Sequence, residues 1–254
     1  MKVQKENTQN LGVKRSLFYD TWLRLLKNKA AVTGLVFMVL LILVAIFADF
    51  LYDYDTEVIA QHIQERLIEP CLAHPFGTDE FGRDLLARVV HGSRMSLIVS
   101  FSSVAISLTI GGLLGAVSGY YGGRIDDIIM RITDILLAIP MTLFAIVIVA
   151  ALGANTRNLA LALAASSVPI FARIVRGSVI TVRDVEYVEA ARAIGATNRV
   201  IIARHILPNC LAPIIVQVTL RIATAIYNTA ALSFLGMGVQ APAPEWGGLL
   251  SSGR

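Results

Sequence analysis

Lysine is absent from this chain after Lys29, and charged residues of every kind make up only 16% of its 254 residues. A soluble domain usually carries about 25% charged residues. A nucleotide-binding P-loop needs a lysine in the pattern GxxxxGK[ST] to reach the phosphates, and no such pattern precedes Lys29. The chain therefore has no P-loop, and we do not expect it to bind ATP through this motif.

Cysteine and histidine are also scarce, with two and four residues respectively. Cys71 and Cys210 have no paired spacing that would indicate a disulfide framework or a zinc site. The histidines form no HExxH pattern, and no serine lies in the GxSxG context of a nucleophile elbow. We therefore expect no catalytic residues, no metal and no cofactor, and the chain is not expected to be an enzyme.

Hydrophobic residues account for 56% of the chain, and they occur in long blocks. A helix rises about 1.5 Å per residue, so about 20 apolar residues cross the hydrocarbon core of a bilayer. We predict an all-α fold, a polytopic transmembrane helix bundle with five spans. The predicted spans lie at about residues 31–48, 95–120, 128–152, 159–179 and 210–235.

Small residues recur every fourth position in the second predicted span, at Ser103, Ser107, Gly111, Gly115 and Gly119. This spacing places them on one face of a helix, where they let a neighbouring helix backbone approach closely. The stripe predicts a packed bundle rather than an isolated membrane anchor.

The distribution of lysine and arginine predicts the orientation of the spans. Basic residues predominate before the first span and after the fourth, whereas acidic residues outnumber arginines in the loop at 51–94. We expect a cytoplasmic tail at 1–30 and a transmembrane domain at 31–254. Within this domain, the loops at 51–94 and 236–254 are expected to be external, and the loop at 180–209 cytoplasmic.

The segment at residues 16–27 has apolar residues on one face and charged residues on the other. This pattern is typical of a helix that lies in the membrane interface. It fits the first turns of a long membrane helix equally well.

The stretch "EAARAIGATNRVIIARHILPN" (189–209) interrupts the apolar runs between the fourth and fifth spans. Its pattern predicts two short helices, the first ended by Gly195 in a left-handed conformation. We expect caps at Asp184 and Thr197, a helix end at Pro208, and an apolar side formed by Val185, Val188, Ala191 and Ile194. Two readings remain open from periodicity alone: a surface that docks another protein, and an amphipathic linker lying on anionic lipid.

This stretch resembles the cytoplasmic EAA loop of ABC importer permeases. The matching residues are Glu189, Ala190, Ala191, Gly195, His205, Leu207, Pro208 and Asn209. Three further stretches are similar to the dipeptide, oligopeptide and nickel importer permeases: "HPFGTDEFGRDLLARVVHGSRMSL" from His74, "GYYGGRIDDIIMRITDILLAIP" from Gly119, and "LSFLGMGVQAPAPEWG" from Leu232. The resemblance covers nearly the whole chain from the first span onward.

The resemblance implies a six-span permease in the inner or plasma membrane of a prokaryote, with a cytoplasmic N-terminus. Arg254 would then precede the sixth span. The implied partners are a second permease subunit, two cytoplasmic ATP-binding subunits, an external substrate-binding protein and membrane lipid, with no nucleic acid. In this family the EAA loop couples to an ATPase subunit, which assigns that role to Glu189, Ala190, Ala191, Gly195, His205 and Pro208.

The resemblance favours a peptide substrate: a dipeptide, an oligopeptide or a glutathione-like tripeptide. Nickel is an alternative, although the spans contain no cluster of His or Cys. A secondary transporter driven by an ion gradient is a second alternative. Such a transporter would favour inverted repeats and several buried acids, and no internal repeat is visible.

Arg221 lies ten residues beyond Leu211, about 15 Å into the fifth span. A charge at that depth costs at least ~2.5–3.5 kcal/mol on insertion scales, so it should face the bundle or a wet cavity. Arg221, together with Asn228 and Thr229, is a candidate for the substrate pathway. The alternative, a structural partner for a carbonyl or for an acid on the partner permease, is favoured because such residues often pair within the bundle.

Overall fold

The computed structural model describes residues 25–253. These residues form helices and loops, and their only extended pairing is a β-bridge between Thr78 and Asp84. The chain divides into two compact units, residues 1–44 and 45–254, and each is described by itself. The interfacial helix predicted at 16–27 falls almost entirely outside the described residues.

The first unit contains most of α2 (Lys29–Ile46), an 18-residue helix whose only charged residue is Lys29. Eighteen residues rise about 27 Å, close to the thickness of a hydrocarbon core. This helix confirms the first predicted span.

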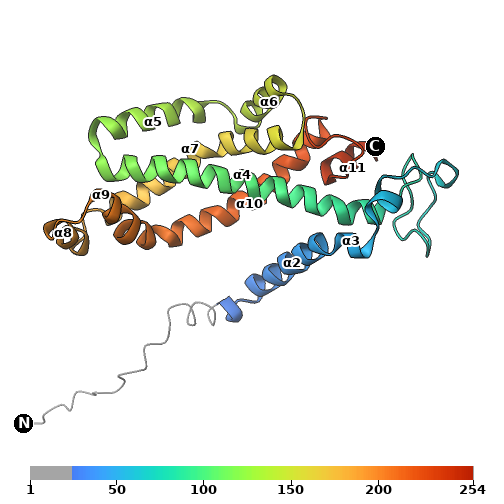
Figure 1. Cartoon of the computed structure of the whole chain (residues 1–254), viewed down its shortest axis with the longest axis horizontal. Helices are drawn as coiled ribbons and strands as arrows, with labels where there is room; N and C mark the ends of the chain where they lie inside the picture. Colours follow the sequence, from blue (N-terminus) through green and yellow to red (C-terminus); the bar gives the residue numbers. More distant parts are fainter. Residues whose placement is uncertain (1–24, 254) are drawn as a thin grey trace, which may run out of the picture. The chain divides into compact units, whose positions relative to one another are not determined.

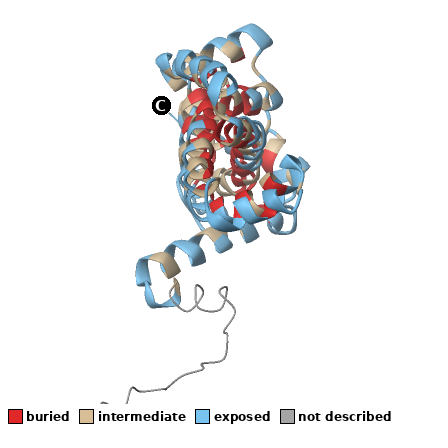
Figure 2. Ribbon diagram, turned by 90° about the vertical axis from the view of Figure 1, so that its left-hand side faces the viewer, coloured by how far each residue is buried: buried red, intermediate tan, exposed pale blue. Residues whose placement is uncertain are grey.

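Three long helices form the centre of the second unit: α4 (Leu85–Tyr121), α7 (Thr156–Val182) and α10 (Leu211–Phe234). Each contacts the other two, and the pairing of α4 with α7 is the most extensive (Figure 1). Buried residues gather along these helices in the interior of the bundle (Figure 2). An all-α bundle is therefore confirmed.

The predicted small-residue stripe lies at the contact between α4 and α7. All five of its members are buried: Ser103, Ser107, Gly111, Gly115 and Gly119. A Cβ atom added to Gly115 would lie 2.3 Å from the carbonyl oxygen of Ala172 on α7. At Gly111 it would lie 2.5 Å from the carbonyl oxygen of Val168. The two helix backbones therefore touch, as the stripe predicts.

Helix α4 begins at Leu85 rather than near Met95, so the segment predicted as a loop at 51–94 ends in helix. The cause is Asp84, whose side chain accepts a hydrogen bond of 2.8 Å from the backbone N–H of Ala87. This N-cap satisfies one of the free N–H groups of the first turn and lets the helix start early.

The third predicted span is divided by a sharp bend rather than formed by one straight helix. It divides into α5 (Gly123–Ala138) and α6 (Met141–Leu152), bent by 89° at the break. Pro140 has no N–H to donate and disfavours helical backbone at the preceding residue, and Ile139 is extended with φ −88° and ψ 127°. Within residues 25–253, four helices are long and apolar enough to span a membrane, or five if the bent pair counts as one span.

Short helices complete the described part of the chain. Three lie before α4: α3 (Ala48–Leu51), the π-helix η1 (Tyr54–Ile59) and the 3-10 helix η2 (Ile63–Glu65). Between α7 and α10 lie α8 (Glu186–Ala193), α9 (Asn198–Val200), the π-helix η3 (Ile201–Ile206) and the 3-10 helix η4 (Leu207–Cys210). The last is α11 (Trp246–Ser252).

The contact of α4 with α7 gives a paired test. Gly115→Ala places a Cβ against the backbone of α7, and such overpacking costs about 1–3 kcal/mol. Gly112→Ala meets only Leu108 Cδ1 at 4.0 Å, so it should be neutral or stabilise the helix by up to ~1 kcal/mol. Thermal unfolding of the purified variants in detergent should show a lower midpoint for Gly115→Ala alone. Equal midpoints would contradict the backbone contact.

Candidate coupling segment and transport pathway

Residues 185–210, here called the EAA segment, form two helical parts joined at Gly195. Gly195 has φ +83°, and its N–H donates to the carbonyl of Arg192 at 3.0 Å. The N–H of Ala196 donates to the carbonyl of Ala191 at 3.1 Å. These two bonds make a Schellman motif, which ends α8 and satisfies its last carbonyls. The predicted left-handed conformation of Gly195 is confirmed.

The inner side of the EAA segment belongs to the core of the bundle. Val188 and Ala191 of α8 pack with Ile201 and Ile206 of η3. The same buried cluster includes residues of the three long helices: Ala116 of α4, Val175 and Val179 of α7, and Ile214 of α10. The segment therefore shares its buried core with all three long helices.

Two residues expected on that apolar side are instead exposed. Val185 precedes α8 as its N-cap, and Ile194, at the C-cap, is 86% exposed. Both lie outside the regular turns of α8, so the 3.6-residue repeat that aligns Val188 with Ala191 no longer places them inward. This part of the prediction was wrong.

Asp184 does not cap α8, which corrects a second expectation. The cap position is Val185, with no side-chain hydrogen bond, and Asp184 instead pairs with Arg183 at 3.1 Å. Thr197 occupies the predicted N-cap position of α9 but makes no cap hydrogen bond.

Pro208 does not end the second helical part, because α9, η3, η4 and α10 follow one another without a break. The proline lies in the first turn of η4, where its missing N–H costs little. The Asn209 side chain donates to the carbonyl of His205 at 2.7 Å. The sequence therefore returns to the bundle through a change of helix type rather than through a loop.

The structure divides the predicted coupling residues between surface and core. Ala191 is buried in the cluster described above, and His205 is half-buried. The others are exposed: Glu189, Ala190, Gly195 and Pro208. Of the exposed members, Glu189 and Ala190 lie on α8 beside the buried Ala191.

Ion pairs attach α5 to α7. Arg176 binds Asp126 through two hydrogen bonds, from Nε at 2.5 Å and from Nη2 at 2.6 Å. Ser118 of α4 donates to the same carboxylate. A second pair joins Arg173 to Asp134 at 2.6 Å. Two-point arginine–carboxylate pairs fix geometry as well as energy, so α5 is held in place beside the long helices.

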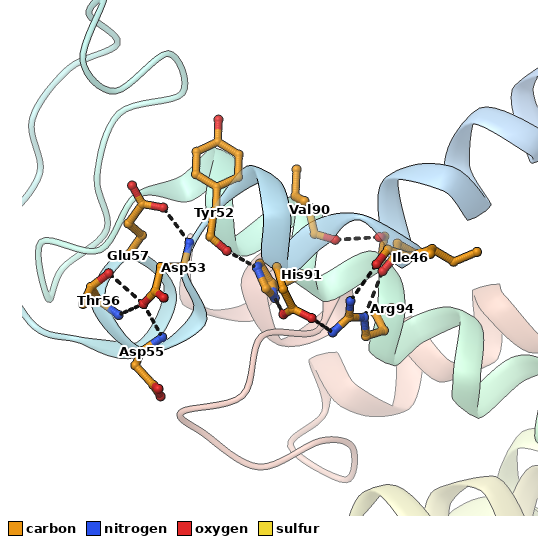
Figure 3. Close-up of polar contacts among 12 residues, drawn as sticks. Ile46, Tyr52, Asp53, Asp55, Thr56, Glu57, Val90, His91 and Arg94 are labelled. Carbon is orange, nitrogen blue, oxygen red and sulfur yellow. Dashed lines mark hydrogen bonds and ion pairs between the residues drawn. The ribbon is translucent and has the colours of Figure 1, made fainter.

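The segment before α4 is tied to that helix by polar contacts (Figure 3). Arg94 donates from Nε to the carbonyl of Ala45 at 2.9 Å and from Nη1 to Asp49 at 2.9 Å. His91 Nε2 lies 2.9 Å from the carbonyl oxygen of Tyr52. These contacts fix α3 against the first turns of α4.

Asp53 caps η1 in the same region (Figure 3). Its carboxylate accepts hydrogen bonds from the N–H groups of Asp55 and Thr56. The hydroxyl of Thr56 donates to it as well and lowers the pKa of Asp53 below its ordinary value. The turn that carries the chain away from α3 is thus locally stabilised.

A cavity of about 340 Å³ lies at this end of the bundle, between residues 80–88 and the segment that follows α10. Arg88, on its wall, is buried and donates to the carbonyl of Val58 at 2.8 Å. Glu245 is also buried; it accepts from Ser96 of α4 at 3.0 Å and from the first N–H groups of α11. Trp246 donates to the carbonyl of Val89 at 3.1 Å. Hydrogen bonds therefore attach α11 to α4, and α11 forms part of the cavity wall.

The three candidate residues for the substrate pathway lie on α10 but differ in how far their side chains are exposed. Thr229 is fully buried and Asn228 is 5% exposed, whereas Arg221 is half-buried. Arg221 Nη1 lies 4.0 Å from the sulfur of Met141, and Nε has no hydrogen-bond partner among the described residues. Arg221 is thus the member of the set that keeps exposed surface, while its unpartnered Nε and the unpartnered hydroxyl of Thr229 are both buried.

Sequence reasoning missed the pairs that span long stretches of chain, such as Asp126 with Arg176 and Ser96 with Glu245. Opposite charges near the ends of adjacent predicted spans were a usable signal for the first pair. An isolated acid directly before a short helix, as in "EWGG", was a signal for the second, because a carboxylate stabilises a helix N-terminus.

Residues 111–253 match the family of binding-protein-dependent transport system inner membrane components. The chain belongs to this family. Residues 16–70 match the N-terminal transmembrane domain of oligopeptide transport permease C. The chain is accordingly a multi-pass inner-membrane permease subunit rather than an enzyme, and the alternative of an ion-driven secondary transporter is not retained.

Curated relatives cover most of the permease. The dipeptide transport system permease protein DppC of Alkalihalophilus pseudofirmus is 49% identical over 92% of this chain and 77% of its own length. The glutathione transport system permease protein GsiD of Pectobacterium atrosepticum is 42% identical over 94% and 79%. Inward-facing MetNI, a methionine ABC transporter, aligns with a TM-score of 0.53 and 21% identity over 60% of this chain and 76% of that chain. The last likeness shows a shared fold.

Proposed function

We propose that this permease subunit forms half of a pathway that imports short peptides, paired with a second permease and driven by two ATPase subunits. The similarity to the dipeptide permease DppC, at 49% identity over 92% of the chain, carries the proposal. A glutathione permease at 42% identity supports the same class, because glutathione is itself a tripeptide. Nickel is less well supported, since both of these relatives are named for peptides.

The EAA segment is proposed as the site that docks an ATPase subunit and couples its conformational change to the permease. Its exposed residues, Glu189 and Ala190, lie on a short helix that a groove could seat. Its buried residues, Val188 and Ala191, are continuous with the core of the long helices. A linker lying on lipid is the alternative, because Val185 and Ile194 of the segment are exposed. The burial of Val188 and Ala191 in the core of the bundle favours the coupling role.

We further propose that the N-terminal tail (1–30) and residues 180–209 are cytoplasmic, and that residues 51–94 and 236–254 are external. Basic residues dominate the first pair of segments, and acids outnumber arginines at 51–94. Cysteines introduced singly at Arg192 and at Asp79, in a chain whose exposed Cys71 is changed to serine, should then react differently with a membrane-impermeant maleimide on intact cells, with labelling only at position 79. Labelling at position 192 from outside would contradict this orientation and the coupling role with it.

Two changes in the EAA segment test the function directly. Glu189→Arg reverses an exposed charge, and Gly195→Val places a β-branched side chain at φ +83°, which costs at least ~1 kcal/mol. Both variants should assemble with their partners yet import a radiolabelled dipeptide at less than about a tenth of the wild-type rate.

Gly195→Asn is the matched control, because asparagine tolerates the left-handed conformation. It should retain most of the uptake. Normal uptake in Glu189→Arg and Gly195→Val would remove the coupling assignment, and a wild-type complex that imports no peptide would remove the proposed substrate class.

Arg221 is proposed as a structural cation of the bundle rather than as a reader of substrate carboxylates. Arg221 is half-buried, so the exposed part of its side chain is open to an acid or carbonyl of the second permease. Arg221→Ala should then lower the amount of assembled transporter and reduce uptake of free and C-terminally amidated dipeptides equally. Normal assembly with a selective loss of free-carboxylate peptides would instead assign Arg221 to the substrate, because an amide cannot replace charge-assisted bonds to a guanidinium.

A further inference from the structure

Three contacts from Arg183 and from the EAA segment converge on the last turn of α4. The hydroxyl of Tyr120 donates to Asn198 Oδ1 at 2.8 Å. The guanidinium carbon of Arg192 lies 6.0 Å from the centre of the Tyr120 ring. Arg183 Nη1 donates to the carbonyl of Gly119 at 2.9 Å. These partners come from the residues before α8, from the end of α8 and from the start of α9.

The convergence means that both helical parts of the EAA segment are held to α4 by polar contacts as well as by the shared core. Tyr120 is half-buried, whereas Asn198 and Arg192 are exposed. The hydrogen bond therefore lies at the edge of the buried cluster, where the segment would begin to separate from α4 if it moved alone. Tyr120 is placed to make the segment and the helix move together.

The opposite end of α4 makes a second set of attachments. Val89 accepts from Trp246, Ser96 donates to Glu245, and Arg88 donates to the carbonyl of Val58. These contacts connect the first turns of α4 to α11 and to the wall of the 340 Å³ cavity. A displacement of α4 would therefore reshape that cavity.

One unbroken helix joins the two sets of contacts. α4 has 37 residues, which corresponds to a length of about 55 Å. It contains no proline and no change of helix type between Leu85 and Tyr121. Its backbone approaches that of α7 closely along the glycine stripe.

We propose that Tyr120 is a positioning residue through which the EAA segment and α4 move together, and that α4 links the ATPase-facing segment to the cavity at the far end of the bundle. This inference rests on the proposed coupling role of the EAA segment. It adds the route by which an event at the cavity, such as docking of the loaded binding protein, reaches the ATPase.

The test uses the complete transporter in proteoliposomes and measures ATP hydrolysis with and without dipeptide-loaded binding protein. Tyr120→Phe removes the hydroxyl alone. The ratio of stimulated to basal hydrolysis should fall about two- to tenfold, the range expected for the loss of one neutral hydrogen bond. Basal hydrolysis and the amount of complex should stay at the wild-type level.

Tyr121→Phe is the matched control. Tyr121 is the exposed neighbour, and its ring makes an edge-on contact with the Tyr120 ring that phenylalanine preserves. This variant should behave as wild type. Asn198→Ala changes the same hydrogen bond from its exposed side, so it should reproduce Tyr120→Phe, and the double variant should be no worse than either single variant.

Wild-type stimulation in Tyr120→Phe, or additive losses in the double variant, would overturn the inference. Fewer complexes with unchanged stimulation per complex would also overturn it, because this result assigns Tyr120 a purely structural role. Glu189→Arg distinguishes the coupling role of the EAA segment from the positioning role of Tyr120. If Glu189→Arg uncouples transport and Tyr120→Phe does not, the coupling role is supported and the route through Tyr120 is contradicted. If Glu189→Arg does not uncouple, the coupling role itself falls.

Discussion

Direct contact between the backbones of α4 and α7 is the constraint on which the rest of the permease depends. In a bilayer the hydrophobic effect does not drive helices together, so association relies on close packing and internal polar contacts. Gly111, Gly115 and Gly119 supply the close packing, because any side chain at Gly115 would collide with a carbonyl of α7. Once these two helices are in contact, the ends of both carry their attachments at fixed positions.

Polar pairs then extend this central contact to the weaker elements. The carboxylate of Asp126 is shared by Arg176 of α7 and Ser118 of α4, which holds α5 although the break at Pro140 separates it from α6. At the other end, the buried carboxylate of Glu245 connects α4 to α11. Each carboxylate is satisfied by several donors, which is the condition under which burying such a group is tolerated.

Much of this arrangement could be predicted from local sequence, because it depends on short-range physical preferences. The apolar runs predicted the first, second, fourth and fifth spans. The repeat of small residues at every fourth position predicted close packing, which the contact of α4 with α7 shows. Gly195 predicted the turn after α8. Two prolines were misread. Pro140 breaks a run that its apolar composition suggested was continuous, and Pro208 lies in a first turn, where a proline is compatible with helix. The pair of Tyr120 with Asn198, 78 positions apart, depends on the register between segments, which no local pattern encodes.

The uninterrupted course of α4 also fixes the number of residues between its two ends. Inserting one residue in an α-helix advances everything beyond it by about 1.5 Å and turns it by about 100°. Such an insertion between Val89 and Tyr120 would rotate one end away from its partners, so either Trp246 or Asn198 would lose its contact. An insertion beside Leu72, a fully exposed residue of the loop before α4, would change that loop alone. The number of residues in α4 therefore fixes both the distance between its two ends and their relative rotation about the helix axis.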